Sequence, residues 1–407
     1  MNFSINELGL LMNFNMVGTL AIGLVSLYIG LYIKNHSSFF NKFGIPAPVI
    51  GGIIFAVVHL IIRQVGIGTI EYDTTLQSPF MVAFFTTIGI GSSVAALKKG
   101  GKLLIIFWVL SGIMTLMQTV IGVSVARATG INPLFGVLAG SVSMSGGHGS
   151  AGAFGSTVEA MGVIGASTMA LSSATFGLLA GGLLGAPLAL YLIRKHKLVA
   201  QNVVGKDDIN LKDEFQKRDI TADELLKHIA VLAIIMMVGT SMSSFLAKSL
   251  NFALPGYVGA MFIAIIFNNL NIKFNWIDMN RNLIDIIGVT SLNIFLSMAL
   301  ISLRLWELAS LAIPMIVILM CQVVFMALFT TFVVFRAMGK DYDAAVMVSG
   351  MCGSGLGATT NAMLNMGEVS ERHGYTANPY LIVTLTGAFL IDIFQMPVII
   401  TAINMFK

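Results

Sequence analysis

Charged side chains are scarce in this sequence of 407 residues. Asp, Glu, Lys and Arg together make up 10% of the chain, whereas hydrophobic residues make up 56%. Soluble domains carry about 25% charged residues, so this scarcity excludes an ordinary water-soluble protein. The formal net charge is only +4 at pH 7, and we expect no nucleic-acid partner. The composition predicts an integral protein of a lipid bilayer.

Cysteine is nearly absent, and so is a basic N-terminal flank. The two cysteines, Cys321 and Cys352, lie in apolar or Gly-rich stretches, which excludes a disulfide framework and a cysteine metal site. We expect no resident cofactor. The first basic residue is Lys34, so the apolar stretch 8–33 lacks the positive flank of a signal peptide. We expect this stretch to remain as the first membrane span.

Long apolar stretches fill the rest of the chain, six on each side of a polar segment at 194–228. They cover residues 8–33, 46–62, 79–97, 103–126, 133–156 and 160–193, then 229–250, 255–271, 282–303, 308–335, 343–366 and 378–406. A transmembrane helix needs about 20 predominantly apolar residues. The fifth stretch of each set is short and rich in Gly, a residue that is about 1 kcal/mol worse than Ala in a helix.

The two sets of stretches resemble each other. The matches run in the same order at nearly constant offsets of 206 to 210 residues. They pair IPAPVIGG at Ile45 with LPGYVGAM at Leu254, Phe85 and Thr87 with Phe295 and Ser297, ARATG at Ala126 with FRAMG at Phe335, and SGGHGSAGA with GSGLGATTNA. This regularity favours an internal duplication over chance similarity between apolar segments.

The basic residues indicate how the two halves are oriented. If the fifth stretch of each half enters and leaves on one face, each half spans five times, and the second half is inverted. Eighteen basic residues then lie on one face and five on the other. Basic residues near short loops mark the cytoplasmic side, so segment 194–228 is expected there and both termini outside. If the Gly-rich stretches crossed the membrane fully, Arg336 and Lys340 would lie on one membrane face and Arg372 on the other. The basic residues would then be divided less unequally between the two faces.

These patterns predict an all-α polytopic membrane protein with about ten transmembrane helices in two inverted five-helix repeats. The repeats cover 1–193 and 229–407, with re-entrant hairpins at about 133–156 and 343–366 and a cytoplasmic linker at 194–228. Inverted repeats with broken segments in corresponding positions are typical of secondary transporters. Non-helical backbone at membrane depth occurs only where protein buries it or where it lines a watery cavity.

The first hairpin is expected to bind an anionic substrate at its tip. The candidate substrate-binding residues there are Ser145, Gly146, Gly147, His148, Gly149 and Ser150. Glycines let backbone N–H groups approach a ligand closely, and a helix that starts there points its positive N-terminus at an anion. The alternative is a small-residue helix interface. In such interfaces glycine recurs every fourth residue, whereas here it clusters as GGxG.

The second hairpin carries hydroxyl and amide side chains besides its glycines. Its candidate substrate-binding residues are Gly353, Ser354, Gly355, Gly357, Thr359 and Asn361. Hydroxyl, amide and freed carbonyl oxygens suit a small hard cation such as Na⁺, so Thr359, Thr360 and Asn361 are also candidate Na⁺ ligands. The alternative is a hydroxyl-rich helix whose side chains bond back to backbone carbonyls.

Three polar residues lie inside predicted spans. Asp392 is about midway along the last one, where a carboxylate is costly and therefore a functional candidate. Its open roles are Na⁺ ligand, proton carrier, or partner of a cation or backbone donor. Gln118 and Gln322 lie in the fourth span of each half. They are candidates for substrate contact, with hydrogen bonding between helices as the alternative.

The sequence resembles the bacterial sodium/glutamate symporters over essentially its whole length. The stretches that carry the resemblance are FFTTIGIG, LAGSVSMSGGHGSAGAFG, FLSMALISLRLWELASLAIPM, FMALF, MGKDYDAAV, GSGLGAT and GAFLIDI. The family's GGxG motif corresponds to Gly146–Gly149, and its second-loop motif to Gly353–Gly357. The resemblance implies a Na⁺-coupled glutamate importer of the bacterial inner membrane, a homodimer, two re-entrant loops that meet near the substrate, and elevator-like movement of a transport domain.

Two adjacent positions depart from the family pattern. Members often continue the second loop as GATPTA, where this chain has Thr360 and Asn361. A proline would fix φ and remove a backbone donor, so the departure leaves the transporter class intact and opens the choice of substrate. The alternatives are a Na⁺- or H⁺-coupled carrier of aspartate, malate or citrate, and, in another class, an intramembrane serine hydrolase that pairs Ser354 with His148.

Overall fold

The chain folds into a bundle of helices. The computed structural model describes residues 2–6, 9–92, 94–201, 203–204, 221–250, 254–309 and 311–407. Its α-helices are α1 (Met16–His36), α2 (Ser38–Lys42), α3 (Ala47–Gln64), α4 (Gln77–Gly91), α5 (Val94–Ala128), α6 (Pro133–Val137), α7 (Gly147–Ala160), α8 (Ala166–His196), α9 (Ala222–Leu250), α10 (Gly256–Phe274), α11 (Arg281–Ile301), α12 (Ala312–Phe329), α13 (Phe335–Ala337), α14 (Tyr342–Leu356), α15 (Thr359–His373), α16 (Ala377–Leu385) and α17 (Ile391–Phe406). The π-helical turns are η1 (Leu138–Val142), η4 (Thr330–Val334) and η5 (Thr386–Leu390), and η3 (Leu305–Leu308) is a 3₁₀-helix.

Many of these helices have the length and apolarity that a bilayer requires. Eight helical stretches among the described residues are long and apolar enough to cross a membrane. Helix α4 has only 15 residues, and α16, η5 and α17 follow one another without a gap. The expectation of a largely helical, polytopic membrane protein is confirmed at this level.

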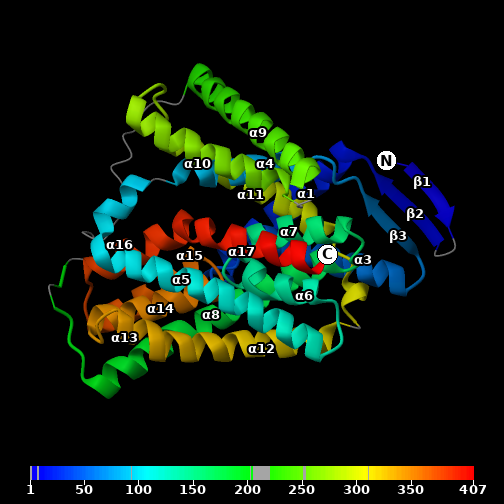
Figure 1. Ribbon diagram of the computed structural model, residues 1–407. Coiled ribbons are helices and arrows are strands. Elements are labelled where there is room, and N and C mark those ends of the chain that lie inside the picture. The colour runs from blue at the N-terminus through cyan, green and yellow to red at the C-terminus, as the bar shows by residue number, and fades with distance from the viewer. Residues whose placement is uncertain are drawn as a thin grey trace.

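A small β-sheet at the N-terminus corrects the all-α prediction. Strands β1 (Asn2–Asn6) and β2 (Gly9–Phe14) pair antiparallel, and β2 pairs in parallel with β3 (Gly68–Tyr72). Figure 1 shows this sheet at one end of the bundle. The apolar stretch expected to form a helix from residue 8 therefore begins as a strand. Helix α1 starts after Asn15, whose side chain accepts a hydrogen bond from the Gly18 N–H.

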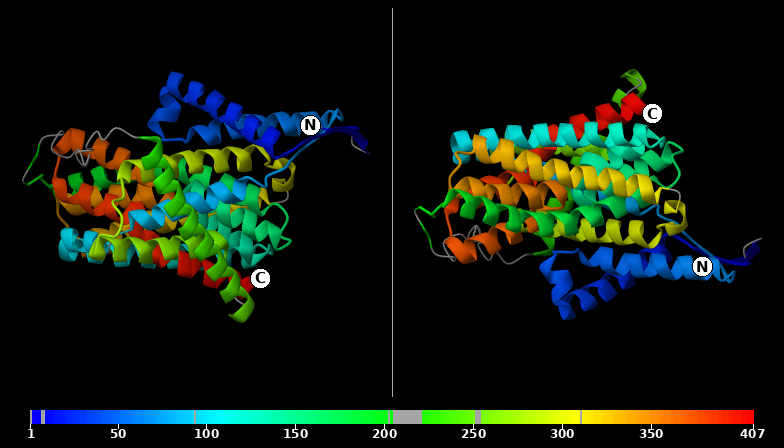
Figure 2. Two further views of the ribbon diagram at one scale, coloured as in Figure 1. Left: turned by 90° about the horizontal axis from the view of Figure 1, so that it is seen from above. Right: turned by 90° about the horizontal axis from the view of Figure 1, so that it is seen from below.

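The helices pack in two groups. The flanking group consists of α1, α3, α4, α9, α10 and α11, and the hairpin group consists of α5–α8 and α12–α17 with their π-helical turns. Each helix packs mainly within its own group, while the contacts between the groups include those of α7 with α11 and of η5 with α4. Figures 1 and 2 show the helices side by side, and in Figure 1 α9 and α10 lie at the edge opposite α8 and α12.

Two segments of the hairpin group are broken helices. The second broken segment (342–373) consists of α14 and α15, which pack closely against each other. The Tyr342 hydroxyl, where α14 starts, donates to the Gly374 carbonyl, just after α15 ends (2.6 Å). The Asn365 amide donates to the Ser349 carbonyl (3.3 Å). These contacts place the two arms antiparallel, so the chain enters and leaves the segment at one end.

The first broken segment (133–160) consists of α6, η1 and α7. Its chain turns at Ser145 and Gly146, and η1 packs against α7. Beyond the turn, α7 runs back along α8, because His148 faces Thr175 (3.0 Å) and a Cβ at Gly155 would contact Ser167. Both broken segments lie against α8.

Several backbone features recur in the two halves of the structure at offsets of 209 or 210 residues. The recurring features are a proline N-cap (Pro46 and Pro255), positive-φ glycines (Gly130 with Gly339 and Gly165 with Gly374) and a proline inside a helix (Pro187 and Pro397). A polar contact recurs too. The Thr119 and Ser141 hydroxyls are 2.7 Å apart, and the Thr330 hydroxyl is 3.4 Å from the Cys352 sulfur.

The boundaries differ from those predicted where the helices become polar. The arms of the broken segments extend to Ala160 and His373, beyond the predicted 156 and 366. Helix α8 continues to His196 and α9 already begins at Ala222, so both ends of the predicted linker 194–228 are helical. Residues 205–220 of that linker lie outside the described residues.

Candidate functional site

The tips of the two broken segments touch each other. Gly147 has a φ of +59°, and a Cβ atom there would lie 2.7 Å from the Gly357 carbonyl oxygen. Only glycine combines this left-handed backbone with so close an approach. Under the tips, a Cβ at Gly177 of α8 would contact both the Leu356 carbonyl and Met144. The middle of α8 is therefore where the two tips meet.

The helix starts at the tips lack side-chain caps, whereas those at the outer ends have them. Asn132 and Asp341 cap α6 and α14, each by accepting a hydrogen bond from a backbone N–H of the first turn. The residues before α7 and α15 are Gly146 and Ala358, and neither supplies a side-chain cap. The first N–H groups of a helix need a partner and carry its positive dipole end. Two such ends face the centre of the protein, which suits anionic groups.

A single carbonyl holds the turn of the first broken segment. The Ser141 carbonyl oxygen accepts hydrogen bonds from the Gly146 N–H (3.1 Å), the Ser145 hydroxyl (3.0 Å) and the Gln395 side-chain amide (3.2 Å). Gln395 lies on α17 and is fully buried. A Cβ at Gly146 would collide with its amide nitrogen. Ser141 and Gln395 were not singled out from the sequence. Gln395 could have been noticed, because it is a polar residue in the last apolar stretch, three residues after Asp392.

The histidine of the first tip lies within hydrogen-bond distance of a hydroxyl on α8. The His148 Nε2 lies 3.0 Å from the Thr175 hydroxyl, and His148 is 6% exposed. The Ser354 hydroxyl donates to the Gly350 carbonyl (3.1 Å) within its own helix. The nucleophile and base that a serine hydrolase requires are therefore each engaged with another partner. Thr175 is a further residue that the sequence did not single out.

The tip of the second broken segment is tied to several neighbouring elements. The Gln118 amide on α5 donates to the Gly355 carbonyl (2.6 Å). The Asn361 amide donates to the Leu178 carbonyl of α8 (2.6 Å). The Thr359 hydroxyl donates to the carbonyl of residue 387 in η5 (2.8 Å). These bonds fix the end of α14 at one point and the start of α15 at two.

Gln322 bonds to Gln118, which in turn bonds to the second tip. Its amide donates to the Gln118 backbone carbonyl (2.8 Å), and both glutamines are fully buried. Their nitrogens thus link α12, α5 and the second tip, the helix-bonding role that was the alternative to substrate contact. The side-chain oxygens of Gln118, Gln322, Asn361 and Gln395 are buried without a hydrogen-bond partner. Amide oxygens are hard ligands that suit Na⁺.

The remaining predicted site residues lie in the following places. Ser145 and Gly146 form the first turn, and Gly147, His148, Gly149 and Ser150 begin α7; Gly353, Ser354 and Gly355 end α14, Gly357 lies in the second turn, and Thr359, Thr360 and Asn361 begin α15. A Cβ at Gly149 would approach Phe84 of the flanking group (2.9 Å). The first tip therefore borders the boundary between the two groups of helices.

The candidate Na⁺ ligands are not all on one side of the second tip. Asp392 lies in the first turn of α17, one helical turn before Gln395, and is partly buried. Thr359 reaches η5, the π-helical turn that directly precedes α17. Thr360 is exposed and faces the loop at Gly44. Thr359 is thus on the side of η5, whereas Thr360 and the Asn361 side-chain oxygen lie toward Gly44.

Comparison with known proteins identifies the relatives of this chain. A profile of the sodium/glutamate symporter family matches residues 12–375. The sodium/glutamate symporter of Escherichia coli (strain K12) is 39% identical over 388 residues, which cover 94% of this chain and 96% of the relative. That of Haemophilus influenzae is 38% identical over 385 residues, covering 93% and 95%.

A more remote likeness involves a solved structure. The sodium proton antiporter MjNhaP1 from Methanocaldococcus jannaschii matches 95% of this chain and 97% of its own, with a TM-score of 0.43 and 12% identity. A likeness this weak carries no conclusion about fold or function. The near-complete sequence matches do, and they agree with the resemblance seen in the hairpin motifs. The chain belongs to the sodium/glutamate symporter family, a family of membrane transporters and not of enzymes.

Proposed function

We propose that this protein imports L-glutamate by symport with Na⁺. The observation that carries the proposal is the meeting of two uncapped helix N-termini at Gly147 and Gly357. Glutamate has two carboxylates, and each helix start offers N–H groups and a positive dipole end to one of them. The family supports the same substrate and coupling ion, since its curated relatives are sodium/glutamate symporters.

The substrate contacts in this proposal come from both tips. Residues 145–150 surround one carboxylate and residues 353–361 the other. Gln118 and Gln322 act by holding the second tip, because their amide nitrogens bond to backbone carbonyls. His148 is held by Thr175, which orients its ring at the edge of the first tip.

Na⁺ binds near the second tip in this proposal. Its ligands on the η5 side are Asp392 and the Thr359 hydroxyl. The Asn361 side-chain oxygen is buried and without a partner, but it lies toward Gly44, so it joins the site only if the start of α15 shifts. Thr360 contributes only if α15 rotates, since its side chain is exposed. Na⁺ offsets the negative charge of the substrate, which lowers the cost of carrying an anion through a low-dielectric layer. Each net positive charge moved inward along the membrane potential gains about 2.3 kcal/mol per 100 mV.

The two halves form inverted repeats of five spans, with both broken segments as re-entrant hairpins. The recurring prolines and positive-φ glycines support the duplication. The antiparallel arms of 342–373 support a hairpin that does not cross the bilayer. With the basic residues on the cytoplasmic side, the linker 194–228 is cytoplasmic and both termini lie outside, in a bacterial inner membrane.

Transport proceeds by alternating access, with the hairpin group moving against the flanking group. The packing of helices mainly within their own group supports this elevator-like movement. The first tip borders the flanking group at Gly149 and Phe84. Because both tips belong to the hairpin group, a substrate bound between them moves with that group. The homodimer that the family resemblance implies holds the flanking group in place.

Uptake of labelled L-glutamate into proteoliposomes tests the proposal. We expect an inward Na⁺ gradient to stimulate uptake strongly over a K⁺ gradient of the same size. Absence of Na⁺-stimulated uptake of any acidic amino acid would contradict it. Unlabelled aspartate, malate and citrate are added as competitors. Displacement by malate or citrate at lower concentration than by glutamate would assign the carrier to another dicarboxylate, and stimulation by a proton gradient would replace Na⁺ by H⁺.

A further inference from the structure

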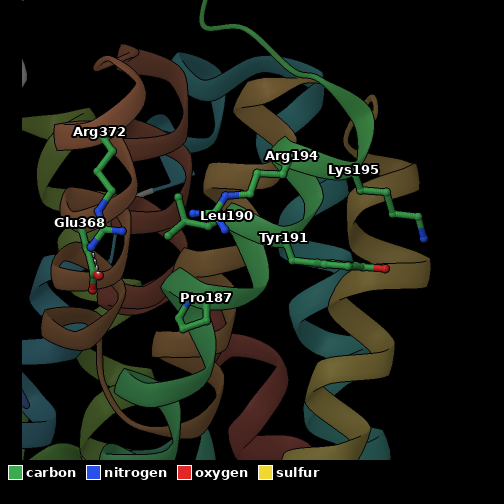
Figure 3. Close-up of a pocket in the computed structure, with 7 residues that line it drawn as sticks. All are labelled: Pro187, Leu190, Tyr191, Arg194, Lys195, Glu368 and Arg372. Carbon is green, nitrogen blue, oxygen red and sulfur yellow. Dashed lines mark hydrogen bonds and ion pairs between the residues drawn. The ribbon is translucent and has the colours of Figure 1, made fainter.

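An open cleft of about 550 Å³ lies between α8 and α15, away from the two tips. Its lining combines apolar and basic side chains and one carboxylate, and Figure 3 shows the residues. They are Pro187, Leu190, Tyr191, Arg194, Lys195, Glu368 and Arg372. Nothing in the transport proposal uses this cleft. By the charge distribution, it lies at the cytoplasmic end of both helices.

The lining residues of α8 change from apolar to basic along one face. Leu190 lies three residues after Pro187, and Arg194 lies four residues after Leu190, which places these three on the same side of a helix. Tyr191 directly follows Leu190 and points the other way in Figure 3. Arg194 lies in the last turn of α8. In Figure 3 the order along the helix is Pro187, then Leu190 and Tyr191, then Arg194. This gradient matches a bilayer boundary, with hydrocarbon beside Pro187 and headgroups beside Arg194.

The charge of the cleft is predominantly positive. Arg372 pairs with Glu368 (3.0 Å), and the Lys195 ammonium lies 5.4 Å from the Tyr191 ring centroid. Among the described residues, no carboxylate lies within 4.0 Å of the Arg194 guanidinium. Figure 3 shows Arg194 extending from α8 toward α15, Arg372 lying along α15 beside Glu368, and Lys195 extending from the other side of α8 with Tyr191. Two arginines thus lie near one carboxylate, and the Arg194 guanidinium is not paired with a carboxylate among the described residues.

We propose that this cleft binds the headgroup of an anionic phospholipid. The Arg194 and Arg372 guanidinium groups hold the phosphate, because their planar donors match its oxygens. An acyl chain lies along Leu190 and Pro187. Basic pockets between membrane helices on the cytoplasmic side bind such headgroups, and the apolar wall below the cations distinguishes a lipid from a free phosphate ion.

The bound lipid would join α8 to the open end of the second broken segment. Arg372 lies in the last turn of α15, next to Gly374, whose carbonyl accepts the Tyr342 hydroxyl. Bridging these elements stabilises the folded protein by mass action. The site is thus expected to raise thermal stability whether or not the protein transports glutamate, so a failure of either proposal can be recognised separately.

Thermal unfolding in detergent, with added lipid, tests the site. The probes are phosphatidylglycerol, phosphatidylethanolamine and glycerol 1-phosphate, each titrated into the purified full-length protein. We expect phosphatidylglycerol alone to raise Tm. The Arg194→Gln variant should need about fivefold more of it for the same shift, and Arg194→Gln with Arg372→Gln about 25-fold more, since each nearby cation contributes about a factor of five. Arg194→Lys should recover part of the loss.

The control variant is Arg336→Gln, which removes another exposed arginine outside the cleft. It should leave the lipid titration unchanged. An equal loss in Arg336→Gln and Arg194→Gln would show diffuse attraction to basic surface and overturn the proposal. Equal stabilisation by glycerol 1-phosphate would assign the site to a free anion, and equal stabilisation by phosphatidylethanolamine would remove the role of charge. Native mass spectrometry of the same samples gives an independent count of retained lipids.

Discussion

The two broken segments follow the same plan, but their tips are held differently. In the first, Ser141 accepts bonds from the turn itself, from Gly146 and Ser145, and α17 adds one donor, Gln395. In the second, Gln118 of α5 donates a hydrogen bond to the tip, and the tip itself donates to backbone carbonyls of α8 and η5. The turn of the first tip is therefore shaped largely by hydrogen bonds within its own segment, although Thr175 of α8 and Thr119 of α5 also contact this segment. The second depends on its neighbours, so changes in those neighbours should reach the ligand through it.

The largest effect is expected where the two tips meet. Gly147→Ala places a Cβ 2.7 Å from the Gly357 carbonyl at a φ of +59°, so the tips must separate. The left-handed backbone alone costs about 1–2 kcal/mol with a side chain. This cost corresponds to about 5- to 30-fold, and separation of the tips adds to it, so we expect a fall in glutamate uptake of at least about fivefold, measured as initial rates in proteoliposomes. The matched control is Gly162→Ala, which has a φ of +96° and open space around its Cβ and should retain most of its uptake.

The carboxylate on α17 should act on the ion more than on the substrate. Asp392→Asn removes a charged ligand, and we expect the Na⁺ concentration for half-maximal uptake to rise about 10- to 100-fold. The KM for glutamate at saturating Na⁺ should change little. An unchanged Na⁺ dependence would remove Asp392 from the ion site. Asp73→Asn, at a loop carboxylate that accepts a hydrogen bond from the Thr75 N–H, serves as the control.

Substitution of two buried glutamines tests whether the two tips are held by different neighbours. Gln395→Leu removes a donor from the first tip and Gln118→Leu removes one from the second. Each lost buried bond should lower kcat/KM for glutamate about fivefold. Hydrogen–deuterium exchange should increase at 141–150 in Gln395→Leu and at 353–361 in Gln118→Leu. The comparison fails if both variants loosen the same tip. Asn271→Leu, a buried amide of the flanking group, should affect neither.

The outer caps should matter for stability and not for the ligand. Asn132→Ala and Asp341→Ala each remove a helix cap, at a cost of about 1 kcal/mol. We expect a fall in Tm of about 2 °C for each variant, with unchanged KM values for glutamate and Na⁺. A raised KM in either variant would show that the outer ends influence the tips.

The smallest effect concerns the connection between the two groups of helices. Burial raises the pKa of the Glu307 carboxyl in η3, against the opposing effect of Arg304. A raised pKa favours the protonated form in the folded state, so this contribution is present at low pH and is lost as the pH rises through the folded-state pKa. Glu307→Gln should therefore flatten the decline of Tm above about pH 4.5. Because Arg63 also lowers the Glu307 pKa, Arg63→Gln should keep the decline or make it steeper.

The two helix breaks of the candidate site could be predicted because their signals are local. Glycines clustered in apolar stretches marked both breaks, and Asp392 was visible as an acid inside a span. The arms were predicted too short because the residues up to His373 are polar, and apolarity was the criterion. The partners Ser141, Thr175 and Gln395 could not be paired from sequence. Their contacts span 27 to 254 positions and depend on how α8 and α17 pack.

The N-terminal sheet shows the same limit. Strand β2 lies in an apolar stretch that continues into α1, and its partner β3 begins at residue 68. Pairing between such distant segments does not change the local pattern of apolar residues. That pattern therefore cannot distinguish this strand from the start of a helix. Pairing across the chain, not local composition, decides the structure there.

Cryo-electron microscopy of the wild-type protein in lipid nanodiscs, with saturating L-glutamate and Na⁺, tests the central claim most directly. The account predicts ligand density between the tips, with one carboxylate at the N–H groups of residues 147–149 and the other at those of 359–361. Glutamate density elsewhere in the hairpin group, or at only one of the two helix starts, would contradict it.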